Sequence, residues 1–201
     1  MKDIEQILNE IKEDKNQNLS TTSFKFKRDV WNYFQNFTTK VAVEFGTNKG
    51  QTTRLLSNLF QKVYTVNLND NAEAKHLNSD ITNIEYISNF NLYSNTPLLV
   101  NEPVSLFFLD AGHRYEEIIL DINRVTSMKC EADCYLLFDD YGSSINIGIK
   151  QAVDQAVDQG VLEIKEWIGH DAGYNFGNAI KGGPDRVLIG KEGVITKIIW
   201  N

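Results

Sequence analysis

The stretch VAVEFGTNKG at residues 41–50 decides the fold of this chain. Its first half is apolar and ends in the acid Glu44, and its second half places Gly46 and Gly50 before a segment with helical spacing, QTTRLLSNLFQ. Glycine lets the backbone pass close to a ligand and tolerates a positive φ. A helix start offers free N–H groups and the positive end of a dipole. The stretch therefore predicts a buried strand that turns sharply into a helix, a common place to hold a charged small molecule.

Strand-like and helix-like segments alternate along the chain. We expect helices at 50–60, 71–78, 113–128 and 145–159, and strands at 40–45, 62–67, 83–88, 104–109, 134–139, 161–168, 185–190 and 194–200. Several strands are continuous apolar runs, as is typical of strands covered on both faces. The pattern predicts an α/β, Rossmann-like, mostly parallel sheet with helices on both faces. Because strand follows strand after residue 160, we expect an antiparallel C-terminal edge.

The composition is that of one globular domain spanning 1–201, with 42% hydrophobic and 23% charged residues. Residues 1–38 are expected to form one or two amphipathic helices over the sheet or its ligand crevice. The net charge of −7 argues against a general nucleic-acid binder. The N-terminus lacks the apolar core of a signal peptide, and no apolar run is long enough to span a membrane. With two cysteines expected as reduced thiols, we predict a cytoplasmic protein; its oligomeric state stays open.

Polar side chains follow five successive predicted strands. Ligands of open α/β sheets bind beyond the carboxyl ends of the strands, so these positions are candidates for a site. They are Glu44, Thr47, Asn48, Asn67, Asn69, Asp70, Ser88, Asn89, Asn91, Asp110, His113, Asp139, Asp140 and Tyr141, together with Gly46, Gly50 and Gly112.

Three stretches resemble class I S-adenosylmethionine-dependent methyltransferases, in particular the macrocin-type sugar O-methyltransferases. VAVEFGTNKGQTT is similar to the first motif of that superfamily. FFLDAGHRYEEIILDI is similar to the fourth-strand motif of the branch, and YLLFDDYGSSINIGIKQAVDQAV to its fifth-strand motif. Together they span roughly residues 41–157. The second and third are the more specific, since spaced glycines serve many nucleotides.

The resemblance implies that S-adenosylmethionine is the cofactor. Glu44 would bond to its amino group, directly or through water. Gly46 and Gly50 would permit close passage of the backbone, and Thr47 and Thr52 would offer hydroxyls near the helix start.

Three further positions are implied to face the cofactor. Asn67 stands where the family has an acid that accepts both ribose hydroxyls, so a charge-assisted bond worth about 1–2 kcal/mol is lost. Asn89 is expected at the adenine edge, and Asp110 beside the reacting end.

The resemblance also implies a divalent metal such as Mg²⁺ on Asp110, Asp139 and Asp140, because carboxylate oxygens suit a hard ion. The metal would clamp a substrate diol and lower the pKa of the attacked hydroxyl. Sugar-modifying members place a catalytic Asp where this chain has Gly112. His113 is the nearest replacement and is a competent base near neutral pH. The expected catalytic residues are His113 and Asp110.

We therefore expect a methyltransferase acting on a hydroxyl of a small sugar-like or polyol-like acceptor, with Mg²⁺ assistance. A non-catalytic binding protein of the same fold stays open, since Asn67 and Gly112 depart from the family pattern. A nicotinamide-dependent oxidoreductase also stays open, although it calls for a tighter G-x-G-x-x-G and an acid about 20 residues on.

Structural roles remain open for the same side chains. Asp110 could cap a helix, His113 could be a surface residue, and Asp139 or Asp140 could cap a turn. Outside the motifs, we expect an apolar helix face or a substrate lid to be formed by Trp31, Tyr33, Phe34 and Phe37. The glycine-rich segment 169–183 is expected to line the substrate pocket or to form a surface loop.

Overall fold

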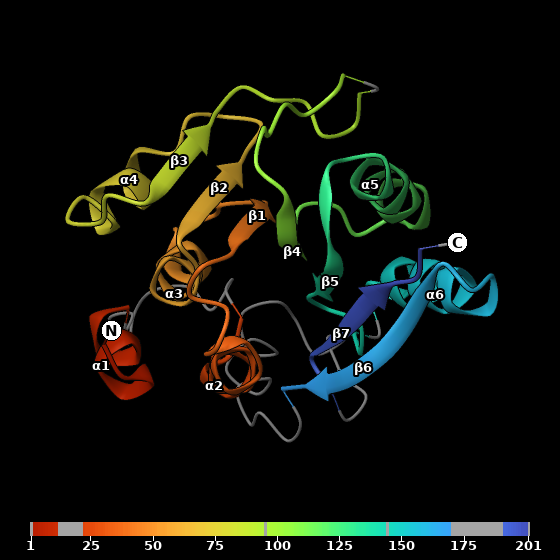
Figure 1. The fold of residues 1–201 in the computed structure, drawn as a ribbon, viewed down its shortest axis with the longest axis horizontal. Coiled ribbons are helices and arrows are strands. Elements are labelled where there is room, and N and C mark those ends of the chain that lie inside the picture. The colour runs from red at the N-terminus through yellow and green to blue at the C-terminus, as the bar shows by residue number, and fades with distance from the viewer. Residues whose placement is uncertain (1, 12–21, 95, 144, 170–190, 201) are drawn as a thin grey trace.

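A twisted β-sheet with helices on both faces forms the centre of the computed structural model, which describes residues 2–11, 22–94, 96–143, 145–169 and 191–200 (Figure 1). The described strands are β1 (Val41–Phe45), β2 (Lys62–Val66), β3 (Ile84–Ile87), β4 (Val104–Leu109), β5 (Cys130–Phe138), β6 (Leu162–Ile168) and β7 (Gly193–Ile198). The described helices are α1 (Ile4–Glu10), α2 (Phe24–Phe34), α3 (Gln51–Leu59), α4 (Ala72–Leu77), α5 (Tyr115–Thr126) and α6 (Ile147–Asp158).

The described strands form one seven-stranded sheet in the order β3-β2-β1-β4-β5-β7-β6. Strands β1 to β5 pair in parallel, whereas β7 pairs antiparallel with both β5 and β6. The predicted mostly parallel sheet with an antiparallel C-terminal part is therefore confirmed. The strand predicted at 185–190 lies outside the described residues, as does all of the segment 169–183 except Gly169.

The order of the strands reverses between β1 and β4. The chain proceeds outward from β1 through β2 to β3 and then returns to the other side of β1 as β4. Ligands of open α/β sheets bind at such a switch point, beyond the carboxyl ends of the strands. Those ends lead into Gly46 and Asp110, so the topology brings two of the predicted site residues together.

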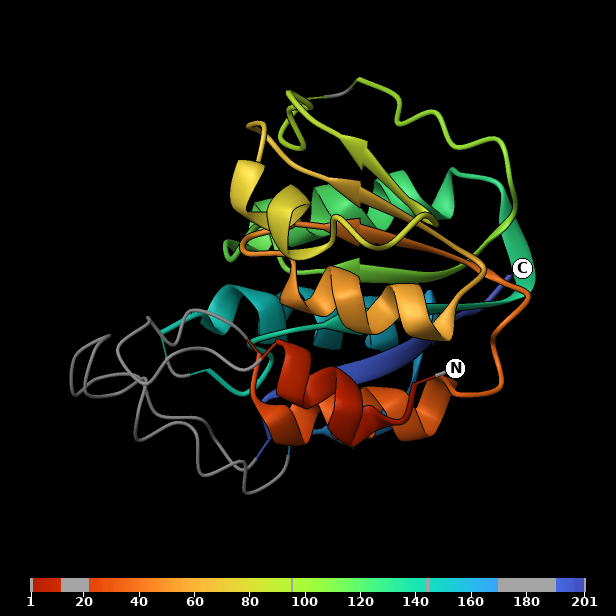
Figure 2. The ribbon, with the colours of Figure 1, turned by 90° about the vertical axis from the view of Figure 1, so that its left-hand side faces the viewer.

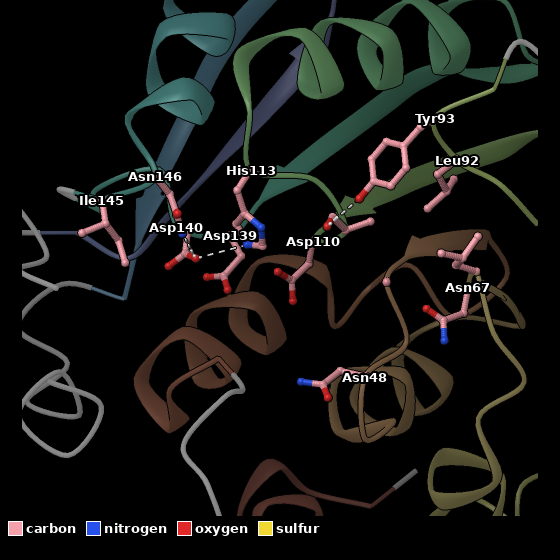
Figure 3. A pocket seen from close by; sticks show the side chains of 13 residues that line it. Asn48, Asn67, Leu92, Tyr93, Asp110, His113, Asp139, Asp140, Ile145 and Asn146 are labelled. Carbon is pink, nitrogen blue, oxygen red and sulfur yellow. Dashed lines mark hydrogen bonds and ion pairs between the residues drawn. The ribbon is translucent and has the colours of Figure 1, made fainter. Parts of the chain in front are cut away.

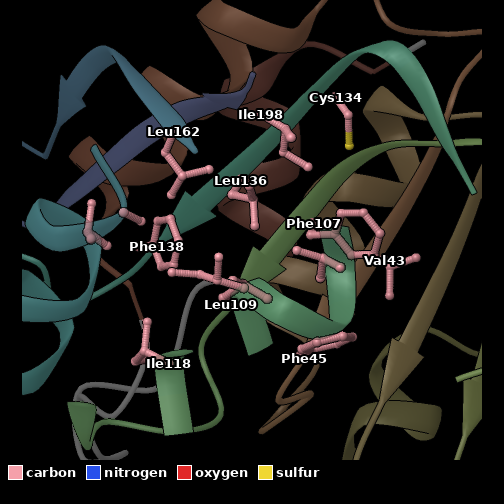
Figure 4. Packing of buried hydrophobic residues seen from close by; sticks show 14 of the residues in the cluster. Val43, Phe45, Phe107, Leu109, Ile118, Cys134, Leu136, Phe138, Leu162 and Ile198 are labelled. Carbon is pink, nitrogen blue, oxygen red and sulfur yellow. The ribbon is translucent and has the colours of Figure 1, made fainter. Parts of the chain in front are cut away.

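Alternate side chains of the central strands point to opposite faces of the sheet, as the period of a strand requires. One core layer joins Val43, Phe107 and Leu136 to Ile118 of α5 and Val153 of α6 (Figure 4). The other layer lies under the N-terminal helices and α3 (Figure 2). Its residues include Phe26, Val30, Phe34, Ala42, Leu55, Leu59, Leu106, Phe108 and Leu137.

The N-terminal helices cover the sheet through their aromatic side chains. Trp31 and Phe34 are buried in the second core layer, and Tyr33 and Phe37 pack against it. This packing supports the interpretation of an apolar helix face. Both cysteines carry free thiols. No helix in the described part of the chain has the length and apolarity needed to cross a membrane.

Candidate active site

The turn after β1 is built around two glycines in the left-handed region. Gly46 has φ +94°, and a Cβ atom there would lie 2.4 Å from the carbonyl oxygen of Asp110. Gly50 has φ +78°, and its Cβ would lie 2.6 Å from the side-chain nitrogen of Asn78 and 2.8 Å from Cβ of Ala74. Glycine is thus required at both positions because neighbouring segments of the chain leave no room for a Cβ atom. Gly46 brings the ends of β1 and β4 together, and Gly50 seats α3 against α4.

Glu44, at the end of β1, is a buried carboxylate with one satisfied oxygen. Its Oε2 accepts hydrogen bonds from the hydroxyls of Thr53 at 2.5 Å and Thr65 at 2.6 Å. Its Oε1 has no hydrogen-bond partner among the described residues. Burial raises the pKa of Glu44 to about 7, although the two hydroxyl bonds favour the ionised form. The sequence alone did not reveal Thr53 and Thr65 as the partners of this acid.

Glu44 borders a small hollow next to the larger cavity at the switch point. The hollow is lined by Thr22, Glu44, Gly46, Thr47, Asn48, Lys49, Gln51, Thr52 and Asp110. The predicted cofactor hydroxyls already make contacts within the protein. Thr47 lies 2.7 Å from the hydroxyl of Thr65, and Thr52 lies 3.4 Å from that of Thr22.

The larger cavity, of about 460 Å³, has the size of a small-molecule site. Its lining comprises Gly46, Asn48, Asn67, Leu68, Leu92, Tyr93, Asp110, Ala111, His113, Asp139, Asp140, Ile145 and Asn146. Figure 3 shows Asp110 in the middle of this lining, with Asn67, Leu92 and Tyr93 to one side and the acidic residues after β5 to the other. We call the first side the apolar half and the second, with Asp139, Asp140, His113, Ile145 and Asn146, the acidic half.

The acidic half gathers carboxylates from two neighbouring strand ends. Asp139 is only 6% exposed, and its Oδ1 has no hydrogen-bond partner among the described residues. Burial, and then the charges of Asp140 and Asp110, hold the pKa of Asp139 well above its ordinary value. Burial and the charge of Asp140 raise the pKa of Asp110 to about 8. These acids resist simultaneous ionisation, which a cation in the cavity would relieve.

Asp140 is held in place by its own backbone and by two neighbours. It adopts φ +56°, and its Oδ2 accepts a hydrogen bond of 2.6 Å from the side chain of Asn146. The same oxygen lies 3.5 Å from Nε2 of His113 (Figure 3). His113 is therefore placed beside a carboxylate at the edge of the cavity.

The loop before α5 positions His113. Oε2 of Glu117 accepts hydrogen bonds from the backbone N–H groups of His113 at 3.0 Å and Arg114 at 3.1 Å. Arg114 occupies the N-cap position of α5, so the helix-cap role considered for Asp110 is wrong. A Cβ at Gly112 would lie 2.8 Å from Cβ of Glu117, which leaves little room for the family's Asp at that position.

The apolar half contains hydrophobic side chains that the sequence did not indicate. Asn67 lines it and donates a hydrogen bond to the carbonyl of Asn69 at 3.1 Å. Asn89 does not line the cavity, and Leu92 and Tyr93 stand there instead. These two residues and Leu68 were missed because they are apolar, although they too follow the ends of β2 and β3.

Arg124 of α5 anchors the segment that carries Leu92. Its guanidinium donates to the carbonyls of Leu92 at 2.6 Å and Ser94 at 2.5 Å, and it pairs with Asp121 at 3.0 Å. Arg124 and Asp121 are both buried. A buried pair on α5 thus fixes one wall of the cavity.

The described side chains do not fit the predicted metal centre. Asp110, Asp139 and Asp140 line one cavity, yet no group of three or more His, Cys, Asp or Glu residues in the described part of the chain is arranged to hold a metal ion. Magnesium therefore gains no support from the arrangement of these aspartates.

The sequence matches no protein-family model and no curated protein. Its fold is similar to that of several solved structures. An O-methyltransferase from Bacillus cereus, solved in complex with S-adenosylhomocysteine, has a TM-score of 0.66 at 14% identity, covering 100% of this chain and 92% of that one. An rRNA methylase from Streptococcus thermophilus has a TM-score of 0.57 at 17% identity, covering 90% and 99% of the two chains.

A third structure, a SAM-dependent methyltransferase from Aquifex aeolicus, has a TM-score of 0.57 at 13% identity, covering 99% of this chain and 100% of that one. Because the identities are low, these likenesses show the fold: a class I methyltransferase fold, as the sequence motifs predicted. The macrocin-type branch is not distinguished by them.

Proposed function

We propose that this protein is an S-adenosylmethionine-dependent methyltransferase that acts on a hydroxyl group of a small molecule. The observation that carries the proposal is the cavity at the β1/β4 switch point, which has an apolar half and an acidic half with Asp110 between them. A nucleoside and a polar acceptor need these two environments. The net charge of −7 and the acidic wall favour a small acceptor over a nucleic acid.

The described residues fit the cofactor. Oε1 of Glu44, which has no hydrogen-bond partner in the described part of the chain, offers a buried carboxylate oxygen for the cofactor's amino group. Asn67 is the polar side chain at the end of β2 for the ribose, and Leu92 and Tyr93 offer apolar surface for the adenine. When bound, S-adenosylmethionine would supply a sulfonium methyl group, whose transfer to the acceptor oxygen would leave the carbon–sulfur electron pair on sulfur.

His113 is the candidate base. The acceptor hydroxyl gives its proton to the imidazole, which then carries a positive charge beside Oδ2 of Asp140 at 3.5 Å. A carboxylate in that position orients the ring and stabilises the imidazolium. Asn146 and Glu117 keep Asp140 and the His113 backbone in place, so the pair is preorganised.

Calorimetry and turnover test the proposal. We expect the protein to bind S-adenosylmethionine and S-adenosylhomocysteine but not NAD, and to consume the methyl donor with a hydroxylated acceptor from a broad panel. The variant His113→Gln should lose about 10²- to 10⁴-fold in kcat while retaining its affinity for S-adenosylhomocysteine.

The matched control is His76→Gln, because His76 is an exposed histidine on α4. This variant should keep full activity. Binding of NAD without binding of the methyl donor would favour the oxidoreductase. Binding of the donor without turnover on any acceptor would favour the non-catalytic protein.

A further inference from the structure

Acidic side chains predominate among the described residues around the acidic half. Asp139 and Asp140 line it, Asp110 borders it, and Glu192 lies near enough for its charge to act on Asp139. Glu192 is itself fully buried and accepts a hydrogen bond of 2.8 Å from the backbone N–H of Ser23.

Among the described residues, Lys27 and His113 are basic groups near these acids. The buried ammonium of Lys27 acts on Asp110 and donates to the hydroxyl of Thr22 at 2.7 Å. His113 stands at the edge of the cavity beside Asp140. Because these clustered, buried acids resist ionising together, a ligand that brings positive charge would favour their ionised forms, whereas an anion would oppose them.

Asp139 provides the second observation, which is independent of the charge count. Its Oδ1 belongs to a cavity-lining side chain that is 6% exposed, and it has no hydrogen-bond partner among the described residues. A buried polar oxygen without a hydrogen-bond partner is costly, and once Asp139 is ionised this oxygen can only accept. Oδ2 of Asp140, by contrast, already accepts from Asn146. The missing donor at Asp139 is thus expected to arrive with the ligand.

The lining of the acidic half includes one large, exposed apolar side chain. Ile145 lines the cavity and is 53% exposed. In Figure 3 Ile145 lies beyond Asp140, at the end of the lining that is farthest from Asn67. Large exposed apolar side chains beside a pocket offer a surface for the hydrocarbon part of a ligand.

We propose that the methyl acceptor is a cationic amino alcohol whose ammonium group donates to Oδ1 of Asp139, whose hydroxyl faces His113 and whose hydrocarbon part lies against Ile145. This inference rests on the proposed function, because it identifies the acceptor of that reaction. The ammonium supplies both the missing donor and the positive charge, whereas a neutral diol supplies only the donor.

Three probes with one carbon skeleton test this assignment by calorimetry, with and without saturating S-adenosylhomocysteine. They are 1-amino-2-hexanol, 1,2-hexanediol and 2-hydroxyhexanoate, which differ in carrying an ammonium, a hydroxyl or a carboxylate. We expect the wild-type protein to bind the amino alcohol at least tenfold more tightly than the diol, and the hydroxy acid not at all. Equal or tighter binding of the diol would overturn the assignment without any variant being made.

The variant Asp139→Asn should reduce the amine-to-diol preference toward one. Its matched control is Asp133→Asn, because Asp133 stands on β5, the strand that ends just before Asp139, and its side chain is 69% exposed and paired with Lys197. The control should keep the preference. An unchanged preference in Asp139→Asn would refute the role of that carboxylate.

Magnesium chloride alone is the remaining arm. Binding of Mg²⁺ that depends on Asp139 and displaces the amino alcohol would assign the cation site to a metal and overturn the inference. The experiment distinguishes failure of this inference from failure of the proposed function. If S-adenosylhomocysteine does not bind, the methyltransferase assignment is contradicted. If it binds but the protein does not prefer the amino alcohol, only the assignment of the acceptor is contradicted.

Discussion

Replacing Glu44 by glutamine tests whether the buried carboxylate binds the cofactor while it lowers the free energy of unfolding. Glutamine has nearly the same shape, and its amide oxygen can accept from the hydroxyls of Thr53 and Thr65. It cannot ionise. The variant therefore removes the buried charge while retaining the packing of the β1 end.

The size of the effect follows from the pKa. Burial raises the pKa of Glu44 from 4.5 to about 7. Between these two pH values the folded protein holds a proton at Glu44 that the unfolded chain has lost, so the free energy of unfolding falls as the pH rises through this window. Since one pKa unit corresponds to about 1.4 kcal/mol, the ionised carboxylate costs the folded state about 3 kcal/mol at pH 8.

Urea unfolding at pH 4.5 and pH 8 measures this cost. We expect the free energy of unfolding of Glu44→Gln, relative to wild type, to improve by about 3 kcal/mol between the two pH values. The other buried acids are common to both proteins, and of these Asp110 has a pKa that the charge of Glu44 also raises. The control is Glu85→Gln on β3, an exposed residue paired with Lys62, which should stay within about 0.5 kcal/mol of wild type at both pH values.

Cofactor binding completes the test. Saturating S-adenosylhomocysteine should stabilise the wild-type protein, by about 2.7 kcal/mol at a hundred times its Kd, and Glu44→Gln should lose most of this gain. A difference in stability that does not change with pH would refute the burial argument. Full retention of the ligand-induced gain would refute the assignment of Oε1 to the cofactor.

Two further outcomes are expected. Asn67→Asp restores the acid that the family resemblance places at the end of the second strand, so calorimetry should show about 5- to 30-fold tighter binding of S-adenosylhomocysteine. The control Asn69→Asp should leave this affinity unchanged. Unchanged or weaker binding by Asn67→Asp would contradict the ribose assignment. Gly46→Ala should lower the free energy of unfolding in urea by about 3 kcal/mol or more, because its Cβ would lie 2.4 Å from the carbonyl oxygen of Asp110. The control Gly160→Ala, at a residue with φ +71° and nothing within 4 Å of the added Cβ, should lower it by only about 1–2 kcal/mol. Equal losses in the two variants would show that the contact with Asp110 does not determine the effect.

Local patterns predicted the elements well. The apolar run at 41–45 and the helical spacing after Gly50 became β1 and α3 almost to the residue. The prediction for β5 was too short, since the strand begins at Cys130 and not at 134. Its first residues are partly exposed and lack an apolar pattern, and a register shift after the pairing of Val104 with Cys130 joins them to the sheet.

The lining of the cavity was only partly predictable. Polar residues at strand ends indicate a site, so the sequence predicted Asp110, His113 and Asp139 in the lining of the cavity. Leu92 and Ile145 were not, because an apolar side chain in a loop carries no local sign that it borders a site. The helix-cap interpretation of Asp110 failed because Glu117, from within α5, bonds the N–H groups before the helix.

The sequence by itself determined the order of strands and helices, because hydrophobic periodicity and glycine placement act over a few residues. It also determined which chemical groups stand at the ends of the strands. Only the tertiary structure decided that β7 lies between β5 and β6 and that Asp110 and Asp139 share one cavity. It also decided that Glu44 and Asp139 each keep an oxygen with no hydrogen-bond partner among the described residues. These features arise from contacts between segments far apart in the chain, which no local pattern encodes.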